Sequence, residues 1–169
     1  LSVTLKRERG ATVANLNAAI GIEHTSVGEI SLREGPGQVD RDRRLDEKRR
    51  NWDYEIGGDY EFPLGAGRLK LIGLRRFDHQ PFTQVLTIDF ADGAPRTGDR
   101  FEQVADQAES ILRSEYRWKA GAADWQLSAE GALNVLDIDN TLARIDPASG
   151  TFVPVPRPGS SARVGEQRA

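Results

Sequence analysis

Cysteine and methionine are both absent from this sequence of 169 residues, and only two histidines are present. Without cysteine the chain has no disulfide bond, no thiolate metal site and no cysteine nucleophile. No apolar run approaches the roughly 18 residues of a transmembrane helix, and the opening LSVTLKRERG lacks the pattern of a signal peptide. Because no methionine begins the chain, we expect it to be an internal fragment of a longer protein.

The charge balance excludes one class of partner. Charged residues make up 29% of the chain, yet the formal net charge is only -3 and no basic face is segregated. Proteins that bind nucleic acids present a clustered positive surface. We therefore do not expect nucleic acid to be a partner.

Motifs that carry catalysis are also lacking. The sequence has no G-x-S-x-G elbow, phosphate-binding loop or H-E-x-x-H pair. His24 and His79 stand at expected boundaries between strand and loop, where exposed loop histidines are the ordinary case. Residues 137–140 (DIDN) lack the glycine and the closing glutamate of a calcium-binding EF-hand loop. We expect no enzymatic activity, no cofactor and no bound metal.

Alternation with a period of two is the strongest pattern present. Over residues 52–62 (WDYEIGGDYEF), apolar or aromatic residues alternate with acidic ones, apart from a central glycine pair. A strand places successive side chains on opposite faces, whereas no helical face fits this pattern. The even-numbered face contains Trp52, Tyr54, Ile56, Gly58, Tyr60 and Phe62, and the other contains Asp53, Glu55, Gly57, Asp59 and Glu61.

The same alternation recurs elsewhere in the chain. It is present over residues 16–22, 110–118 and 125–135. Residues 68–77 (RLKLIGLRRF) are also typical of a strand, but Leu69, Leu71, Ile72 and Leu74 occupy both parities, so the sequence leaves the register of this strand open.

Short and long connections alternate between the expected strands. Short turns are predicted near residues 7–10, 63–67 and 119–124, and they recur about every 56 residues. Long loops are predicted near residues 24–51, 78–104 and 137–161. Residues 1–169 are thus predicted to form an all-β unit of antiparallel up-and-down hairpins, with about six strands and the start of a seventh after Ser160.

Such half-apolar strands occur in transmembrane barrels and in soluble β-sandwiches, and three features favour the barrel. Eleven alternating residues rise about 25 Å at a 45° tilt, which matches the lipid band. Short turns at one end and long loops at the other are typical of outer-membrane barrels. Aromatic side chains at the ends of the apolar faces are expected at the lipid interface: Trp52, Tyr54, Tyr60, Phe62, Tyr116, Trp118 and Trp125.

Open sheet edges cannot be satisfied by lipid, so six or seven strands predict one sector of a larger barrel. The turns near Gly10, Gly65 and Gly121 are expected to face the periplasm, and the long loops to face outward. A soluble β-sandwich that serves as a binding module remains the alternative from a different class.

Two stretches resemble the barrel strands of TonB-dependent outer-membrane receptors. Residues 51–77 (NWDYEIGGDYEFPLGAGRLKLIGLRRF) resemble early strands, and residues 109–134 (ESILRSEYRWKAGAADWQLSAEGALN) resemble the next hairpin. The resemblance implies a barrel of about 22 strands in the outer membrane of a Gram-negative bacterium, closed by a plug domain. It also implies uptake of a scarce ligand such as a siderophore, cobalamin or glycan.

The partners that this resemblance implies are outer-membrane lipid, the plug domain of the same chain, and TonB. This sequence contains neither a plug nor a TonB box. Other large barrels, of the porin type or for lipopolysaccharide assembly, are the alternatives within the membrane class. No ligand-binding residue can be singled out.

Two charged groups complete the expectations. Residues 41–50 (RDRRLDEKRR) hold six basic and three acidic residues, and we hypothesise that Arg43, Arg44, Lys48, Arg49 and Arg50 contact phosphates of lipopolysaccharide. The face opposite the apolar one is expected to line a wet lumen, where its charges pair across strands or meet the plug. These residues are Asp53, Glu55, Asp59, Glu61, Arg113, Glu115, Arg117 and Glu130.

Overall fold

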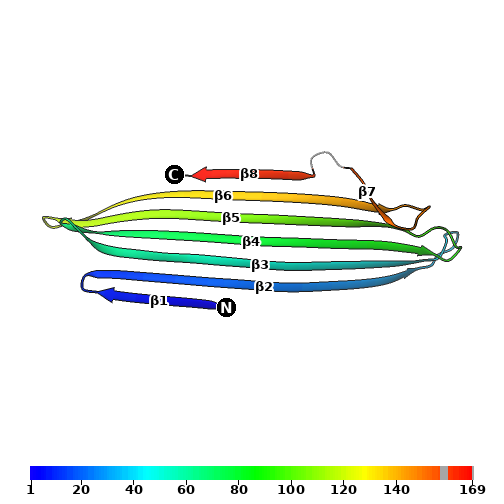
Figure 1. Cartoon of the computed structure of the whole chain (residues 1–169), viewed down its shortest axis with the longest axis horizontal. Coiled ribbons are helices and arrows are strands. Elements are labelled where there is room, and N and C mark those ends of the chain that lie inside the picture. The colour runs from blue at the N-terminus through cyan, green and yellow to red at the C-terminus, as the bar shows by residue number, and fades with distance from the viewer. Residues whose placement is uncertain (157–159, 169) are drawn as a thin grey trace.

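The chain forms one layer of long antiparallel strands (Figure 1), as seen in a computed structural model that describes residues 1–156 and 160–168. The described residues contain no helix long and apolar enough to cross a membrane. The strands are β1 (Ser2–Arg9), β2 (Thr12–Arg33), β3 (Arg41–Leu64), β4 (Gly67–Phe90), β5 (Thr97–Ala120), β6 (Ala123–Ile145), β7 (Phe152–Pro154) and β8 (Ser161–Arg168).

The strands follow one another across the sheet in chain order. Each of β1 to β6 pairs with the next in the antiparallel sense, and β8 pairs with β6 alongside the short β7. The sheet stays open, with β1 at one edge and β8 at the other (Figure 1). The predicted fold class, all-β with antiparallel up-and-down hairpins, is confirmed.

Three two-residue turns lie at one end of the sheet, at the left in Figure 1, and each has the sequence Gly-Ala. The glycines have positive φ angles: 59° at Gly10, 57° at Gly65 and 61° at Gly121. A positive φ at the first central residue alone is the pattern of a type II′ turn, whose twist matches that of the flanking strands. The sequence therefore closes each hairpin with the residue that this turn requires.

The connections at the other end are shorter than predicted. β2 continues to Arg33 and β3 begins at Arg41, while β4 continues to Phe90 and β5 begins at Thr97. Much of the expected loops near residues 24–51, 78–104 and 137–161 is therefore strand. The apolar alternation does end in these regions, but a strand with water on both faces needs only its backbone ladder to persist.

Several groups assigned to loops consequently lie within strands. His24 lies in β2, His79 in β4, residues 41–50 in β3 and residues 137–140 in β6. The acidic run cannot wrap around a cation as a loop does, because successive residues of a strand point to opposite faces. The described residues contain no group of three or more side chains suited to hold a metal ion.

The sheet has almost no interior. Ala143 and Ile145 are the only buried hydrophobic residues among those described, and no large side chain is fully buried. Many large apolar side chains are exposed instead, among them Leu112 at 67% and Leu127 at 65%. A single sheet of this kind has no second layer in the described residues to cover its apolar face.

Candidate functional site

One side of the sheet carries most of the apolar residues in the inner halves of β1 to β6. Residues opposite each other in an antiparallel pair point to the same side, so the register carries the face of Trp52 from strand to strand. We call this side the apolar face. Besides the even residues of β3 from Trp52 to Leu64, it includes Leu5, Leu16, Ile20, Ile22, Leu69, Leu71, Phe77, Leu112, Tyr116, Trp118, Trp125, Leu127, Leu133 and Val135.

The register of β4, which the sequence left open, is fixed by its neighbours. Tyr60 lies opposite Leu71 and Phe62 opposite Leu69, so the odd residues of β4 belong to the apolar face. Ile72 and Leu74 point to the other side. The same register places one charged residue, Arg75, between Ile56 and Ser110 within the apolar face, where its guanidinium donates a 2.7 Å hydrogen bond to the Ser110 hydroxyl.

The aromatic residues form two clusters, one toward each end of the apolar face. Near the Gly-Ala turns, Trp118 stacks on Trp125 with ring centroids 6.3 Å apart, and Tyr116 lies 5.3 Å from Trp118. Tyr60 and Phe62 are also 5.3 Å apart. The Tyr116 hydroxyl donates a hydrogen bond to the Leu64 carbonyl, which ties this inner cluster to the second turn.

The outer cluster is centred on Phe77. Its ring lies 5.2 Å from Trp52 and 5.7 Å from Tyr54. His79 packs against Trp52 at 5.6 Å, and its Nδ1 lies 2.6 Å from an Asp106 oxygen. Sequence reasoning identified Trp52 and Tyr54 but missed Phe77, Arg75 and His79, because the pattern of β4 alone does not reveal its register.

The turns are staggered in a constant direction. In the β2–β3 ladder Val13 lies opposite Glu61, so the turn that ends β3 lies two residues beyond the turn that precedes β2. In the β4–β5 ladder Gly67 lies opposite Trp118, so the turn that ends β5 lies two residues beyond the turn that precedes β4. With about 3.3 Å per residue and 4.8 Å between strands, turns lying in one plane require strands tilted by about 35°. This tilt falls within the range of closed barrels.

The stagger also sets the height of the apolar face. From Trp52 to Phe62 the strand rises about 33 Å, or about 27 Å along the normal to the plane of the turns at this tilt. The outward-facing apolar band of a transmembrane barrel is about 25 Å tall and has aromatic girdles at both edges. Both the height and the aromatic clusters of this sheet match that band.

The opposite side, which we call the charged face, carries a network of ion pairs. Glu115 is the centre of one group: it is only 6% exposed and lies 2.8 Å from Arg113 and 2.7 Å from Arg117. Arg113 also approaches Glu130 at 3.6 Å. The charges predicted to share this face therefore do so, and several pair across strands.

A second group of this network lies over β2, β3 and β4. Asp59 lies 3.4 Å from Lys70 and accepts 3.1 Å hydrogen bonds from the Asn15 amide. Glu61 pairs with Arg68. Because these pairs join neighbouring strands, they hold those strands in register and also neutralise the charges of this face.

The charged face also contains an apolar patch at mid-height. Leu74, Ile111 and Ala132 occupy one row across β4, β5 and β6, beside Gly57 of β3, with Ile72 next to them. A Cβ added to Gly57 would lie 3.2 Å from the Leu74 Cδ1 atom, so the leucine covers the glycine. We call these five residues the mid-height patch.

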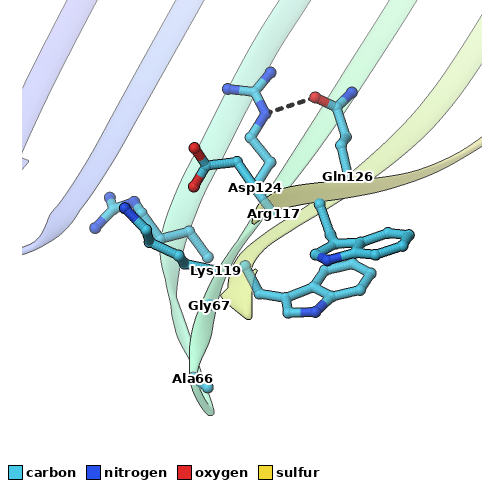
Figure 2. Close-up of a pocket in the computed structure, with 9 residues that line it drawn as sticks. Ala66, Gly67, Arg117, Lys119, Asp124 and Gln126 are labelled. Atoms are coloured by element: carbon cyan, nitrogen blue, oxygen red, sulfur yellow. Dashed lines mark hydrogen bonds between the residues drawn. The ribbon is translucent and has the colours of Figure 1, made fainter. Parts of the chain in front are cut away.

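A hollow of about 500 Å³ lies at the turn end of β4, β5 and β6 (Figure 2). Trp118, Trp125, Lys119 and Asp124 line it, together with Arg117, whose Nε donates a 3.0 Å hydrogen bond to Gln126. The hollow takes residues from both faces and is open to its surroundings. Its polar lining includes Arg117, Lys119, Asp124 and Gln126.

The basic residues of 41–50 do not form one cluster. Arg44, Lys48 and Arg50 share the apolar side of the sheet, whereas Arg43 and Arg49 point to the charged side, because neighbours in a strand alternate. Arg43 pairs with Glu29 at 3.1 Å, and Arg49 lies over the Phe82 ring at 5.0 Å. The five residues therefore cannot all contact one surface, and the hypothesis that they contact lipid phosphates stays a prediction.

No protein-family model matches the chain, and no curated protein sequence is similar to it. Among solved structures, OmpT, an outer-membrane protein of Vibrio cholerae, is similar at 10% identity and a TM-score of 0.17, over 98% of this chain and 62% of its own length. The membrane pore complex of pneumolysin gives 9% identity and a TM-score of 0.23, over 89% and 33%.

Clostridium perfringens delta-toxin gives 6% identity and a TM-score of 0.19, over 90% of this chain and all of its own. This chain therefore spans less than two thirds of the first two proteins. TM-scores of this size support no inference about function. One weak structural neighbour of this antiparallel sheet is thus an outer-membrane protein.

Proposed function

We propose that this chain is a sector of the wall of a large outer-membrane β-barrel. The observation that carries the proposal is the exposed apolar face, about 27 Å tall, with an aromatic cluster at each end and no covering layer in the described residues. In this reading the apolar face contacts lipid, the charged face lines the lumen, and the role of the segment is structural.

The finer proposal is a TonB-dependent receptor that takes up a scarce ligand, with a plug domain inside the barrel. Its support is the charged face: Glu115 is buried, and the half-buried apolar residues Ile72, Leu74 and Ile111 of the mid-height patch lie on the luminal side. A water-filled porin lumen gains nothing from an apolar patch, whereas a lumen filled by protein buries one. TonB and the plug are the partners that this proposal requires.

Two experiments test the barrel proposal and the receptor proposal separately. In the first, cells are fractionated and the protein is located. A barrel protein is expected in the outer-membrane fraction and is extracted only by detergent. Recovery from the aqueous phase without detergent would favour a soluble β-sandwich. The coding sequence on both sides of this segment is then read. The receptor requires a secretory signal and a compact mixed α/β plug upstream, with many further alternating strands downstream. An outer-membrane protein with no plug would be porin-like.

The orientation follows the same reading. The Gly-Ala turns face the periplasm, and the longer connections at residues 34–40, 91–96 and 146–151 face outward. The outer halves of the strands, beyond Trp52 and His79, then stand above the lipid.

A further inference from the structure

Three basic side chains lie together on the apolar side of the sheet, directly beyond its outer aromatic cluster. Arg50 follows Trp52 outward at the next position of the same face, Lys48 follows Arg50, and His24 of β2 lies opposite Arg50. All three residues are exposed. We call them the outer basic site.

The positive charge of this site is not neutralised within the described part of the chain. Neither the Lys48 nor the Arg50 side chain makes an ion pair or hydrogen bond there, while Asp46, the next acidic residue outward on this face, lies 2.9 Å from the Nε of Arg44. The register places only uncharged residues beside Lys48 and Arg50 on the neighbouring strands, namely Ser26, Thr83 and Pro81, besides His24 itself.

Acidic residues at a similar height lie on other strands. Asp106 of β5 is bonded to His79, and Glu102 of β5, in the row of Lys48 beyond Thr83, lies 3.6 Å from Arg100. Asp137 and Asp139 of β6 lie farther along the sheet. Arg163 of β8 approaches Asp137 at 4.0 Å. On this side of the sheet the unpaired positive side chains of the outer basic site lie on β2 and β3, whereas the acidic side chains named here lie on β5 and β6.

The height of the outer basic site above Trp52 indicates which ligand it meets. If Trp52 marks the edge of the hydrocarbon, Arg50 begins about 7 Å farther along the strand, or about 5 Å higher, at the depth of lipid headgroups. Arginine binds phosphate through its planar fork, and lysine supplies a compact charge. We propose that Arg50, Lys48 and His24 bind the phosphate groups of the glycolipid in the outer leaflet. This inference rests on the proposed membrane location.

The test uses the full-length protein in detergent micelles doped with fluorescent lipid A, either phosphorylated or enzymatically dephosphorylated. We expect the wild type to prefer the phosphorylated lipid, and the double variant K48Q/R50Q to lose at least about fivefold in affinity for it, since each cation near an anionic surface contributes about 1 kcal/mol. Excess inorganic phosphate is the competitor that separates a lipid site from a free-anion site.

The matched control is R43Q/R49Q, which removes the same charge from the same strand on the opposite face. It should bind phosphorylated lipid A like the wild type, and K48R/R50K should retain most of the affinity. Equal losses in both double variants, or no preference of the wild type for the phosphorylated lipid, would overturn the proposal. A protein that remains soluble without detergent would instead contradict the membrane location itself.

Discussion

Ile56 and Glu55 are chain neighbours at mid-height of β3 that point to opposite sides of the sheet. Ile56 is 49% exposed on the apolar face. Ile56→Arg should destabilise the folded protein in lipid by about 2–4 kcal/mol, because it places a charge near the middle of the hydrocarbon. Glu55→Arg is the control and should cost far less, since its side remains wet. Urea unfolding in vesicles measures both, and equal costs would contradict the assignment of faces.

Arg75 is a charge that the apolar face already contains. It lies opposite Ile56 on the next strand, two residues inward of Phe77, where the tilt sets it slightly farther from the middle of the hydrocarbon, and its long side chain reaches across to Ser110 directly opposite. Arg75→Leu should stabilise the protein in lipid by about 1–2 kcal/mol, between the midplane and interface costs of an exposed arginine. Arg76→Leu, on the charged face and paired with Asp78 at 3.1 Å, should bring no gain. A loss of stability in Arg75→Leu would count against lipid at this position.

Asp146 holds the outward connection after β6. The Ser149 hydroxyl and the Ala148 backbone N–H donate hydrogen bonds to its carboxylate, and they lower the pKa of Asp146. Because the pKa of Asp146 is lower in the folded protein, these hydrogen bonds stabilise the connection fully at pH values above the pKa of an unfolded aspartate. This stabilisation is lost as the pH falls through the lowered pKa of the folded state. A spin label at position 148 should become more mobile in acid, and Asp146→Asn should abolish that pH dependence.

At the scale of elements, the two-residue turns set the ends of the hairpins. Gly121 has a φ of 61° and no heavy atom within 4 Å of an added Cβ, so Gly121→Ala introduces backbone strain without a clash. It should cost about 1–3 kcal/mol. Gly73 also has open space but no positive φ, so Gly73→Ala should change stability by less than about 0.5 kcal/mol. Similar costs for the two variants would contradict the turn geometry.

The sequence predicted the strands that alternate and the positions of the turns, because period-two patterning and Gly-Ala chemistry are local. It did not predict that β2 to β6 continue well beyond the apolar region, since strand segments such as residues 41–50 have polar side chains on both faces. It could not assign the side of Leu69 or Arg75, because both parities of β4 contain apolar residues. Pairing with β3 and β5 decides that side, and such pairing is not local.

At the scale of the molecule, an open sheet with a constant stagger is the geometry of a barrel wall. Two residues of offset for every two strands imply a tilt of about 35°, and the same tilt brings the aromatic clusters of β3 to β6 into two bands. The edges at β1 and β8 expose backbone groups that lipid cannot satisfy. In the proposed barrel, further strands pair with both edges.

In the proposed barrel the even residues of β3 from Trp52 to Phe62 face lipid, while the odd residues between them do not. These 169 residues contain no cysteine, so in a full-length protein freed of any cysteine elsewhere, single cysteines at positions 52 to 62 can each carry a spin label after reconstitution in vesicles. Collisions with oxygen, which is concentrated in lipid, and with a water-soluble nickel complex are then compared. We expect high oxygen accessibility at every even position and low accessibility at every odd one. Even positions protected from both reagents would show a covered face and contradict this expectation.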